Sequence, residues 1–158
     1  MAVGRTKSGK LAALYRVSSR SFPNREAQIK ETAVAIVPKQ GSEGDVFKNP
    51  YIAYNCMKSV GDTVVATNGA QTDPIAEKIS LGMPVRDAMA TALLALDYEK
   101  DKYNTPRIAA AVTLGAEEGV LGVVRDDGIE VVTVPIESGT VHYVATYETN
   151  RVLPEQRG

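Results

Sequence analysis

The pattern of apolar residues after Pro84 constrains the fold of this chain more than any other feature. Apolar side chains recur there at steps of three and four residues, which gives a helix one continuous apolar face. A shorter helix is predicted just before it, because Asp73 is a capping residue, Pro74 suits the first helical position and Gly82 suits the end. Two adjacent helices of this kind need a partner layer on which to pack. The apolar face of the second helix consists of Val85, Ala88, Met89, Ala92, Leu93 and Leu96.

Runs rich in β-branched and aromatic residues lie on both sides of this helical pair. Those before it cover residues 11–17, 32–38, 51–60 and 63–67, and those after it cover 107–114, 119–124, 129–134 and 141–147. Gly61-Asp62 and Asp127-Gly128 are the predicted hairpin turns. Strands, then two helices, then strands predict a layered α+β fold with antiparallel sheets rather than alternating βαβ units.

The composition bounds the class of protein. A length of 158 residues with 44% hydrophobic content suffices for one core, so residues 1–158 are predicted to form a single domain. Eighteen Lys and Arg oppose 19 Asp and Glu, and a net charge of -1 gives no general attraction to nucleic acid or to an anionic membrane. No export signal is visible, and no apolar window approaches the roughly 18 residues of a membrane helix. We therefore expect a cytoplasmic protein.

The chain has one cysteine, Cys56, and one histidine, His142. These numbers exclude an internal disulfide and an all-Cys/His zinc site, which fits a reducing cytoplasm and predicts no structural metal. Cys56 is predicted to be a small core residue rather than a nucleophile. His142 lies in an alternating strand and is predicted to face solvent, so we assign it no role.

A cluster of arginines and hydroxyl side chains follows the first predicted strand. Guanidinium and hydroxyl groups together are what a phosphate monoester needs. Taken alone, such a cluster is better explained, by about two to one, as a solvated surface loop. Its members are Arg16, Ser18, Ser19, Arg20, Ser21, Asn24 and Arg25.

Two further segments carry polar groups inside apolar surroundings. In the strand that covers residues 51–60, the two-residue period places Tyr54 and Cys56 on one face and Asn55 on the other. A buried tyrosine usually only packs its ring, which is favoured at about three to one. Asn68 closes the next strand, where it either occupies a turn or presents its amide to a substrate.

The end of the second helix, residues 97–104, is dense in titratable groups. Acidic residues in a last helical turn oppose the helix dipole, so Glu99 is a candidate general base. The usual phosphate-loop, dinucleotide, zinc-protease and serine-hydrolase motifs are absent from the sequence. An enzyme of this sequence would need none of those mechanisms.

Three polar strings resemble the archaeal-type IMP cyclohydrolase family. They are Tyr-Arg-Val-Ser-Ser-Arg-Ser-Phe-Pro-Asn-Arg at 15–25, Asn-Pro-Tyr-Ile-Ala-Tyr-Asn-Cys at 49–56, and Asp-Tyr-Glu-Lys-Asp at 97–101 with Asn-Thr-Pro-Arg-Ile-Ala-Ala at 104–110. The similarity runs from about Ala2 to Tyr147. It implies a four-layer αββα fold like that of the N-terminal-nucleophile hydrolases. It also implies closure of 5-formamidoimidazole-4-carboxamide ribonucleotide to inosine monophosphate with loss of water, without a cofactor.

In that reaction a carboxamide nitrogen attacks a formyl carbon, so the site must fold the substrate, stabilise an oxyanion and protonate a departing hydroxide. Within the resemblance, we assign Tyr54 and Glu99 to proton transfer, and Arg25 with Asn68 to the formyl oxygen. Arg16, Ser18 and Arg20 are assigned to the ribose phosphate. Asn24 is a further substrate-binding candidate, and Lys100, Asn104 and Arg107 are weaker ones.

Two differences from that family affect these expectations. Its members begin with a few further residues, so the abrupt start at residues 1–5 predicts a shortened first strand with an unpaired edge. Members also often extend beyond the equivalent of Tyr147, whereas this chain stops at Gly158. Exposed strand edges make a symmetric homo-oligomer the expected assembly.

Two other functions stay open. An amidohydrolase of the N-terminal-nucleophile type needs an exposed Cys, Ser or Thr at its mature start, and Met1-Ala2-Val3 offers none. A purine-nucleotide binding module would hold phosphate with the Arg-Ser loop and perform no ring closure. A scaffold would leave the three polar strings without a reason to occur together.

Overall fold

The computed structural model describes residues 1–18, 22–153 and 155–158. Within them the chain forms ten strands, two long helices and two short ones. The helices are α1 Asp45–Lys48, η1 Pro50–Ile52, α2 Thr72–Ser80 and α3 Val85–Leu96. The strands are β1 Ala2–Arg5, β2 Leu11–Leu14, β3 Arg25–Ile29, β4 Ala33–Pro38, β5 Tyr54–Val60, β6 Thr63–Thr67, β7 Arg107–Thr113, β8 Glu118–Arg125, β9 Gly128–Pro135 and β10 Thr140–Tyr143.

The strands form two antiparallel sheets. The large sheet has the order β3-β4-β5-β6-β7-β8-β9, so strands that follow one another in the sequence pair directly. The small sheet has the order β10-β1-β2 and joins the last strand to the first two. The predicted α+β fold with antiparallel sheets is confirmed.

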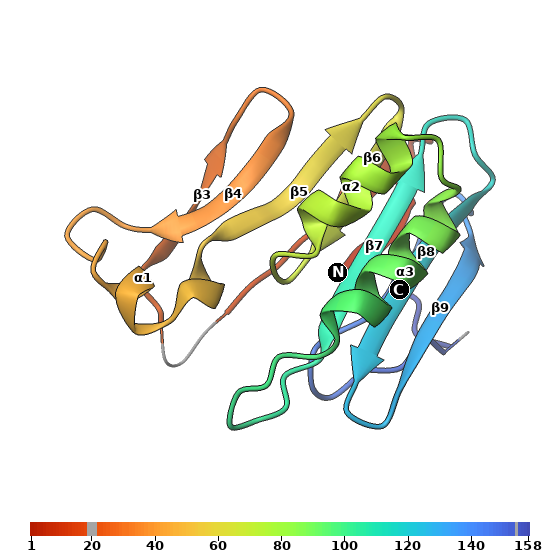
Figure 1. Ribbon diagram of the computed structural model, residues 1–158. Helices are drawn as coiled ribbons and strands as arrows, with labels where there is room; N and C mark the ends of the chain where they lie inside the picture. Colours follow the sequence, from red (N-terminus) through yellow and green to blue (C-terminus); the bar gives the residue numbers. More distant parts are fainter. Residues whose placement is uncertain (19–21, 154) are drawn as a thin grey trace.

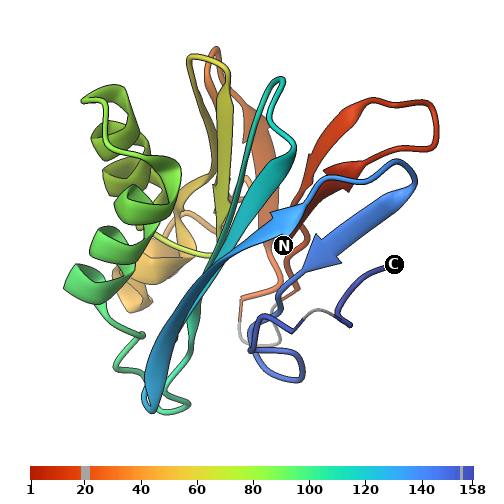
Figure 2. The same ribbon diagram turned by 90° about the vertical axis from the view of Figure 1, so that its right-hand side faces the viewer.

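Helices and sheets are stacked as layers (Figure 1 and Figure 2). Helices α2 and α3 cover one face of the large sheet, and the small sheet lies against its other face. The described residues therefore make three layers, with one apolar core on each side of the large sheet. The outer core includes Met89 and Leu93 of α3, and the inner core includes Val3 of β1 and Leu121 of β8.

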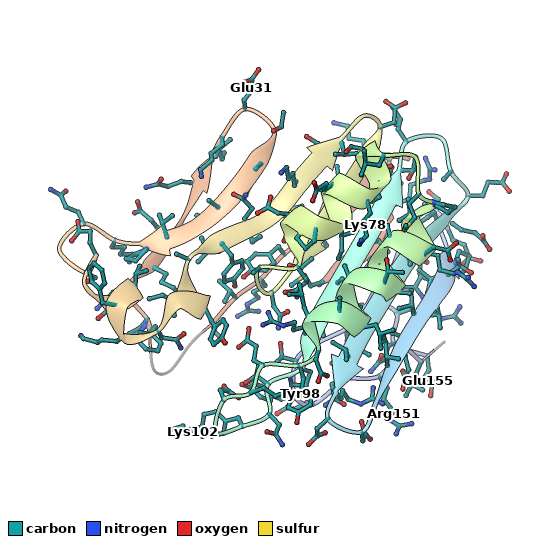
Figure 3. All side chains as sticks on the ribbon, viewed as in Figure 1. Glu31, Lys78, Tyr98, Lys102, Arg151 and Glu155 are labelled. Atoms are coloured by element: carbon teal, nitrogen blue, oxygen red, sulfur yellow. The ribbon has the colours of Figure 1, made fainter. Side chains whose placement is uncertain are left out.

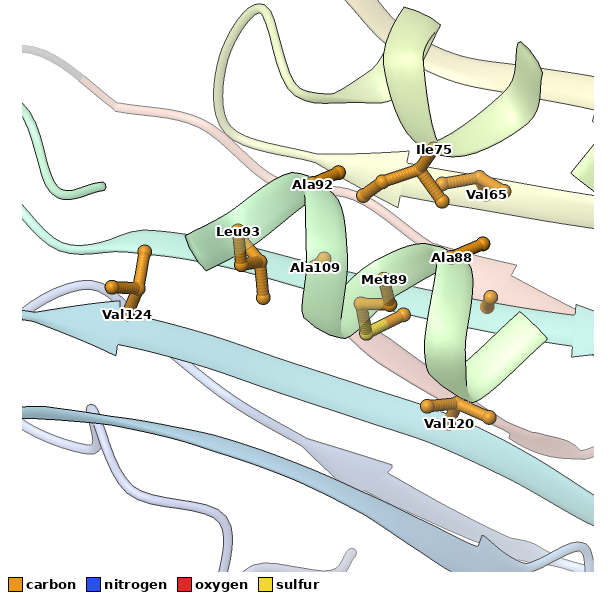
Figure 4. Packing of buried hydrophobic residues seen from close by; sticks show 10 residues of the cluster. Val65, Ile75, Ala88, Met89, Ala92, Leu93, Ala109, Val120 and Val124 are labelled. Atoms are coloured by element: carbon orange, nitrogen blue, oxygen red, sulfur yellow. The ribbon is translucent and has the colours of Figure 1, made fainter. Parts of the chain in front are cut away.

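The predicted face of α3 forms most of its contact with the sheet. Ala88, Met89, Ala92 and Leu93 are buried against the large sheet, as Figure 4 shows. A Cβ atom at Gly122 of β8 would lie 2.6 Å from the Met89 Sδ, so glycine permits this close approach. Leu96 was expected on the same face but is 40% exposed, because the helix ends there and Asp97 turns the chain with a φ of 57°.

The start of α2 differs from the prediction. Thr72 is the first helical residue and Gln71 is the N-cap, so Asp73 lies inside the first turn and caps nothing. Its carboxylate instead accepts hydrogen bonds from Asn55 Nδ2 at 3.1 Å and Lys58 Nζ at 2.8 Å. The helix ends as expected, with Gly82 at a φ of 89°.

No hydrophobic pattern predicted β1 or β3, and a strand at residues 1–5 was expected only from the family resemblance. The four residues of β1 pair with β2 on one side and with β10 on the other, so the expectation of an unpaired edge at the chain start is wrong. A Cβ atom at Gly4 would lie 2.1 Å from the Thr140 carbonyl oxygen, which shows how closely β10 approaches. Strand β3 is mostly polar and lies at the edge of the sheet beside β4, so it carries little hydrophobic signal.

The turns and the last strand need two smaller corrections. Gly61 and Asp62 form a hairpin turn as predicted, between the paired residues Val60 and Thr63. Between β8 and β9, Arg125 pairs with Gly128, so the turn is Asp126-Asp127. Strand β10 ends at residue 143 rather than at 147.

His142 is buried, contrary to the expectation that it faces solvent. It is 4% exposed, because its register partner Val3 and its same-face neighbour Val144 both lie in the core between the two sheets, which places the His142 side chain on that face. Neither ring nitrogen has a hydrogen-bond partner among the described residues. Alternation along the strand showed that its two faces differ, but not which of them is turned to the core.

In the part of the chain that the structure describes, no helix combines the length and the apolar character needed to cross a membrane.

Candidate active site

The polar segments singled out in the sequence meet at one cleft of about 720 Å³. The segment after β2, the segment before β5, the end of β6, the loop after α3 and the chain after β10 all contribute to its walls. Both sheets therefore take part in building it. Lining residues are Val17, Ser18, Phe22, Arg25, Asn49, Tyr51, Ile52, Tyr54, Asn68, Glu99, Asp101, Lys102, Tyr103, Thr105, Thr146 and Tyr147.

Arg25 and Tyr54 lie at the first positions of β3 and β5. The Arg25 guanidinium donates to the carbonyl oxygens of Phe22 at 3.2 Å and Ile52 at 3.3 Å, which fixes it beside the cleft. The Tyr54 hydroxyl oxygen lies 2.6 Å from that of Tyr15, which follows β2 and was not a candidate. Burial raises the pKa of Tyr54, while the hydrogen bond with Tyr15 and the Arg25 charge oppose this rise.

Glu99 reaches the cleft from the loop after α3. Its N–H donates to the Thr105 carbonyl oxygen at 2.9 Å, which closes the loop on itself. Its carboxylate lies 3.3 Å from Arg107 Nη1, and the two side chains are 11% and 6% exposed. Burial raises the pKa of Glu99, while the Arg107 charge lowers it. A carboxyl group held in this way can exchange a proton nearer to neutral pH than an exposed one.

Behind Glu99 lies a buried network that centres on Gln71. The Gln71 amide accepts from Arg107 Nη1 at 3.1 Å and donates to Asn68 Oδ1 at 2.8 Å. Asn68 Oδ1 also accepts from the Ile108 N–H, and its Nδ2 donates to the Pro106 carbonyl oxygen. Most of the bonding capacity of the Asn68 amide is thus used within the protein.

Sequence reasoning missed Gln71, which is fully buried. It stands three residues after Asn68, directly before α2, and a polar residue there resembles an ordinary helix start. Gly69 lies in the same network, because a Cβ atom there would come within 2.8 Å of both Arg107 Nη1 and Gln71 Oε1. Only a glycine leaves room for this arrangement.

The structure brings together part of the predicted site. Arg25, Tyr54, Glu99, Asn68 and Ser18 line the cleft. Arg107 is buried behind Glu99, with its guanidinium 5.7 Å from the centre of the Tyr51 ring. Arg20 lies outside the described residues.

Four other candidates are exposed and do not line the cleft. Lys100 pairs with Asp97 at 2.5 Å and lies over the Tyr98 ring. Asn104 donates to Asp126 at 3.0 Å. The other two are Arg16 and Asn24.

Several lining residues were not predicted. Asp101 shapes the loop after α3, because its carboxylate accepts from the N–H and the hydroxyl of Thr105. Thr105 Oγ1 also lies 3.3 Å from the Tyr147 hydroxyl, which links this loop to the chain after β10. Asp101 and Thr105 could have been found as site residues because they lie in the polar string 97–107. No sequence feature pointed to Tyr147.

Within residues 1–18, 22–153 and 155–158, no three His, Cys, Asp or Glu side chains gather as a metal site would require. The cleft combines a fixed guanidinium with a tyrosine and a carboxyl group whose pKa values are both raised by burial. This geometry defines a layered α+β protein whose cleft holds two groups suited to acid–base chemistry beside a positive charge.

Comparison with known proteins identifies the family. The family model described as IMP cyclohydrolase-like protein matches residues 1–156, and the chain belongs to this family. An IMP cyclohydrolase of Methanococcus aeolicus is 52% identical over 159 residues, covering 99% of this chain and 76% of that protein. An IMP cyclohydrolase of Methanosphaera stadtmanae is 52% identical over 150 residues, covering 95% and 72%. One of Methanocaldococcus jannaschii is 49% identical over 157 residues, covering 99% and 75%.

Proposed function

We propose that this protein is an IMP cyclohydrolase, which closes 5-formamidoimidazole-4-carboxamide ribonucleotide to inosine monophosphate with release of water. The observation that carries the proposal is that Arg25, Tyr54 and Glu99, from three separate polar strings, line one cleft. Its volume of about 720 Å³ lies in the range of roughly 300–1,000 Å³ that is typical of small-molecule sites. Relatives that cover nearly the whole chain carry this enzyme name.

Binding has to hold the two reacting groups together. We assign the ribose phosphate to Ser18, with Arg16 and Arg20 from the same segment. The formyl oxygen is assigned to Arg25, assisted by the remaining N–H of Asn68. Held in this way, the carboxamide nitrogen faces the formyl carbon, and the reaction becomes intramolecular in a fixed geometry. Asn24 remains a further candidate for contacts with the nucleotide, and Lys100, Asn104 and Arg107 remain weaker ones.

The proton transfers follow from the two acid–base groups. The Glu99 carboxylate takes a proton from the carboxamide nitrogen as the C–N bond forms, and the Tyr54 hydroxyl gives one to the formyl oxygen. The resulting carbinol carbon then loses hydroxide, which leaves as water with the proton that Glu99 holds. The former formamide nitrogen loses its proton to the Tyr54 oxygen as the C=N bond forms. Both groups are restored, and the sum is the loss of one water molecule.

The number of layers in the fold, the oligomeric state and the cellular location are inferred along with the function. We infer a four-layer αββα architecture of the N-terminal-nucleophile-hydrolase type, to which α2, α3 and the two sheets correspond as three of the layers. We further infer a symmetric homo-oligomer in the cytoplasm that works without metal or cofactor. The catalytic assignments involve only Tyr, Arg, Asn and Glu side chains, which suits a ring closure that depends on proton transfer and hydrogen bonding.

A spectrophotometric ring-closure assay with chelator-treated protein tests the function. The unsubstituted protein is expected to form inosine monophosphate, while Tyr54→Phe and Glu99→Gln each lower kcat by at least about a hundredfold, in the range of general acid–base catalysis. Glu118→Gln, an exposed carboxylate at the start of β8, is the matched control. Binding of inosine monophosphate without turnover by the unsubstituted protein would overturn the proposal in favour of a nucleotide-binding module.

A further inference from the structure

Tyr15 stands directly behind Tyr54. The two hydroxyl oxygens are 2.6 Å apart, at the short end of O–H···O hydrogen bonds. Tyr54 lines the cleft, whereas Tyr15 does not. Only one of the two hydroxyls donates its proton to the other, so the direction of this bond decides what Tyr54 can do.

The surroundings favour Tyr15 as the donor. The Arg25 charge lowers the pKa of both tyrosines, but only Tyr54 also receives a hydrogen bond from the Arg25 side chain, which further opposes the effect of burial on its pKa. Burial and the neighbouring Tyr54 raise the pKa of Tyr15 strongly, so Tyr15 keeps its proton. With Tyr15 as donor, the Tyr54 hydrogen is free to point into the cleft. A hydroxyl that accepts one hydrogen bond becomes a better donor of the next.

We propose that Tyr15 is a positioning residue that donates its hydroxyl hydrogen to Tyr54 Oη and thereby prepares Tyr54 to release a proton into the cleft. The proposal rests on the acid role assigned to Tyr54 above. When Tyr54 passes its proton to the substrate oxygen, its O–H bond breaks and the electron pair remains on Oη. Tyr15 keeps its own proton and stabilises the phenolate through one hydrogen bond, until Tyr54 is protonated again.

The test compares the ionisation of residue 54 with and without the Tyr15 hydroxyl. Tyr54 is replaced by 3,5-difluorotyrosine, whose phenol is more acidic and therefore loses its proton at a pH at which the protein is still folded. ¹⁹F NMR follows this ionisation in the absence of substrate. Tyr15→Phe is expected to move this titration up by about one pH unit, a tenfold change in acidity. In otherwise unsubstituted protein, Tyr15→Phe should lower kcat about tenfold, leave KM unchanged and shift the basic limb of the pH–kcat profile upward.

Tyr143→Phe is the matched control, because Tyr143 lies on β10 away from the cleft and should change neither readout. If Tyr15→Phe leaves the titration of residue 54 unchanged, the proposal that Tyr15 donates a hydrogen bond to Tyr54 is wrong. An unchanged kcat and pH profile beside a shifted titration would overturn its part in catalysis. If the unsubstituted protein fails to close the ring, the proposed function falls, and the NMR titration still decides on the pair.

A second inference concerns the open edge of the large sheet. Among residues 1–18, 22–153 and 155–158, strand β3 pairs only with β4, residues 26–30 are exposed, and Ile29 is 88% exposed. Figure 1 shows the β3–β4 hairpin projecting beyond the helices, and Figure 3 shows Glu31 at its tip. Such an edge is a template for pairing with another strand.

The backbone and the charges of β3 fit a second copy of the same strand. Lys30 N–H donates to Ala33 O, so even-numbered backbone groups face β4, and those of Ala27 and Ile29 face the open edge. If two copies pair antiparallel about Gln28, Ala27 lies opposite the partner's Ile29, and Glu26 lies opposite the partner's Lys30. Pairing about Glu26 or Lys30 would instead oppose like charges.

We infer that two copies of this chain associate through β3, in the register centred on Gln28. Because only one short strand takes part, the dimer is concentration-dependent rather than obligate. Light scattering over a concentration series at low salt is expected to show this dimer. Glu26→Lys or Lys30→Glu should each weaken it by about tenfold or more, and the double variant should restore it. None of these residues lines the cleft, so ring closure should persist.

Lys10→Glu, an exposed lysine in the turn after β1, serves as the charge control and should leave the dimer unchanged. Circular dichroism verifies that each variant is folded. A protein that stays monomeric over the whole series overturns this inference. So does a double variant that is no better associated than the two single ones, because the register then plays no part.

Discussion

At the scale of single residues, the environment of a side chain decides its chemistry more than its type does. Glu99 and Asp101 belong to the same polar string. Burial raises the pKa of Glu99, whereas hydrogen bonds from Thr105 and the backbone outweigh burial and lower the pKa of Asp101. One of these carboxyl groups is therefore suited to proton exchange, and the other holds the loop in shape.

Cys56 gives a prediction at this scale. It is completely buried, and burial raises the pKa of its thiol to about 11. Because the thiolate is the reactive form, the folded protein at pH 8 should react with a thiol reagent about a hundredfold more slowly than the unfolded chain. Labelling with and without denaturant measures this ratio. Equal rates would show that the strand opens or that the thiol is accessible, contrary to its place in the core.

The same raised pKa affects stability. The unfolded thiol loses its proton at a lower pH than the folded one, so the folded state binds more protons between those two values. The stability connected with Cys56 is therefore complete below the ordinary thiol pKa, and it falls as the pH rises toward 11.

At the scale of helices and strands, the sequence predicted the elements that bury one continuous face. The helix from Pro84, the hairpin at Gly61-Asp62 and strands β4 to β9 all follow from periodicity and turn residues. Periodicity did not reveal strands β1 and β3, because β1 is four residues long with a glycine and β3 has mostly polar residues. Short or polar strands are held by their pairing partners, which a local pattern does not contain.

The candidate site was predictable only in part, for a related reason. Arg25, Tyr54, Glu99, Asn68 and Ser18 belong to polar strings and do line the cleft. Tyr15 stood in one of these strings, yet its contact with Tyr54 joins the segment after β2 of the small sheet to β5 of the large sheet. Gln71 resembles a helix start, and only the fold shows that its amide links Arg107 to Asn68. Partners of this kind depend on tertiary contacts, so sequence periodicity does not reveal them.

At the scale of the whole molecule, the cleft joins the two sheets. Ser18 follows β2 and Tyr147 follows β10 of the small sheet, while Arg25 and Tyr54 belong to the large sheet and Asn68 directly follows its strand β6. A ligand that fills the cleft contacts both sides and binds only when the two sheets are docked. It should therefore stabilise the folded state as a whole rather than one wall of the site.

The last prediction follows from this coupling. Inosine monophosphate at about a hundred times its Kd should stabilise the protein by about 2.7 kcal/mol and raise Tm by several degrees. Differential scanning calorimetry measures the shift, with inorganic phosphate and inosine at equal concentration as controls. Arg25→Ala should reduce the shift from inosine monophosphate, because it removes the fixed positive charge beside the cleft. If phosphate alone raised Tm as much as the nucleotide, the stabilisation would come from anion binding and not from a ligand that spans both sheets.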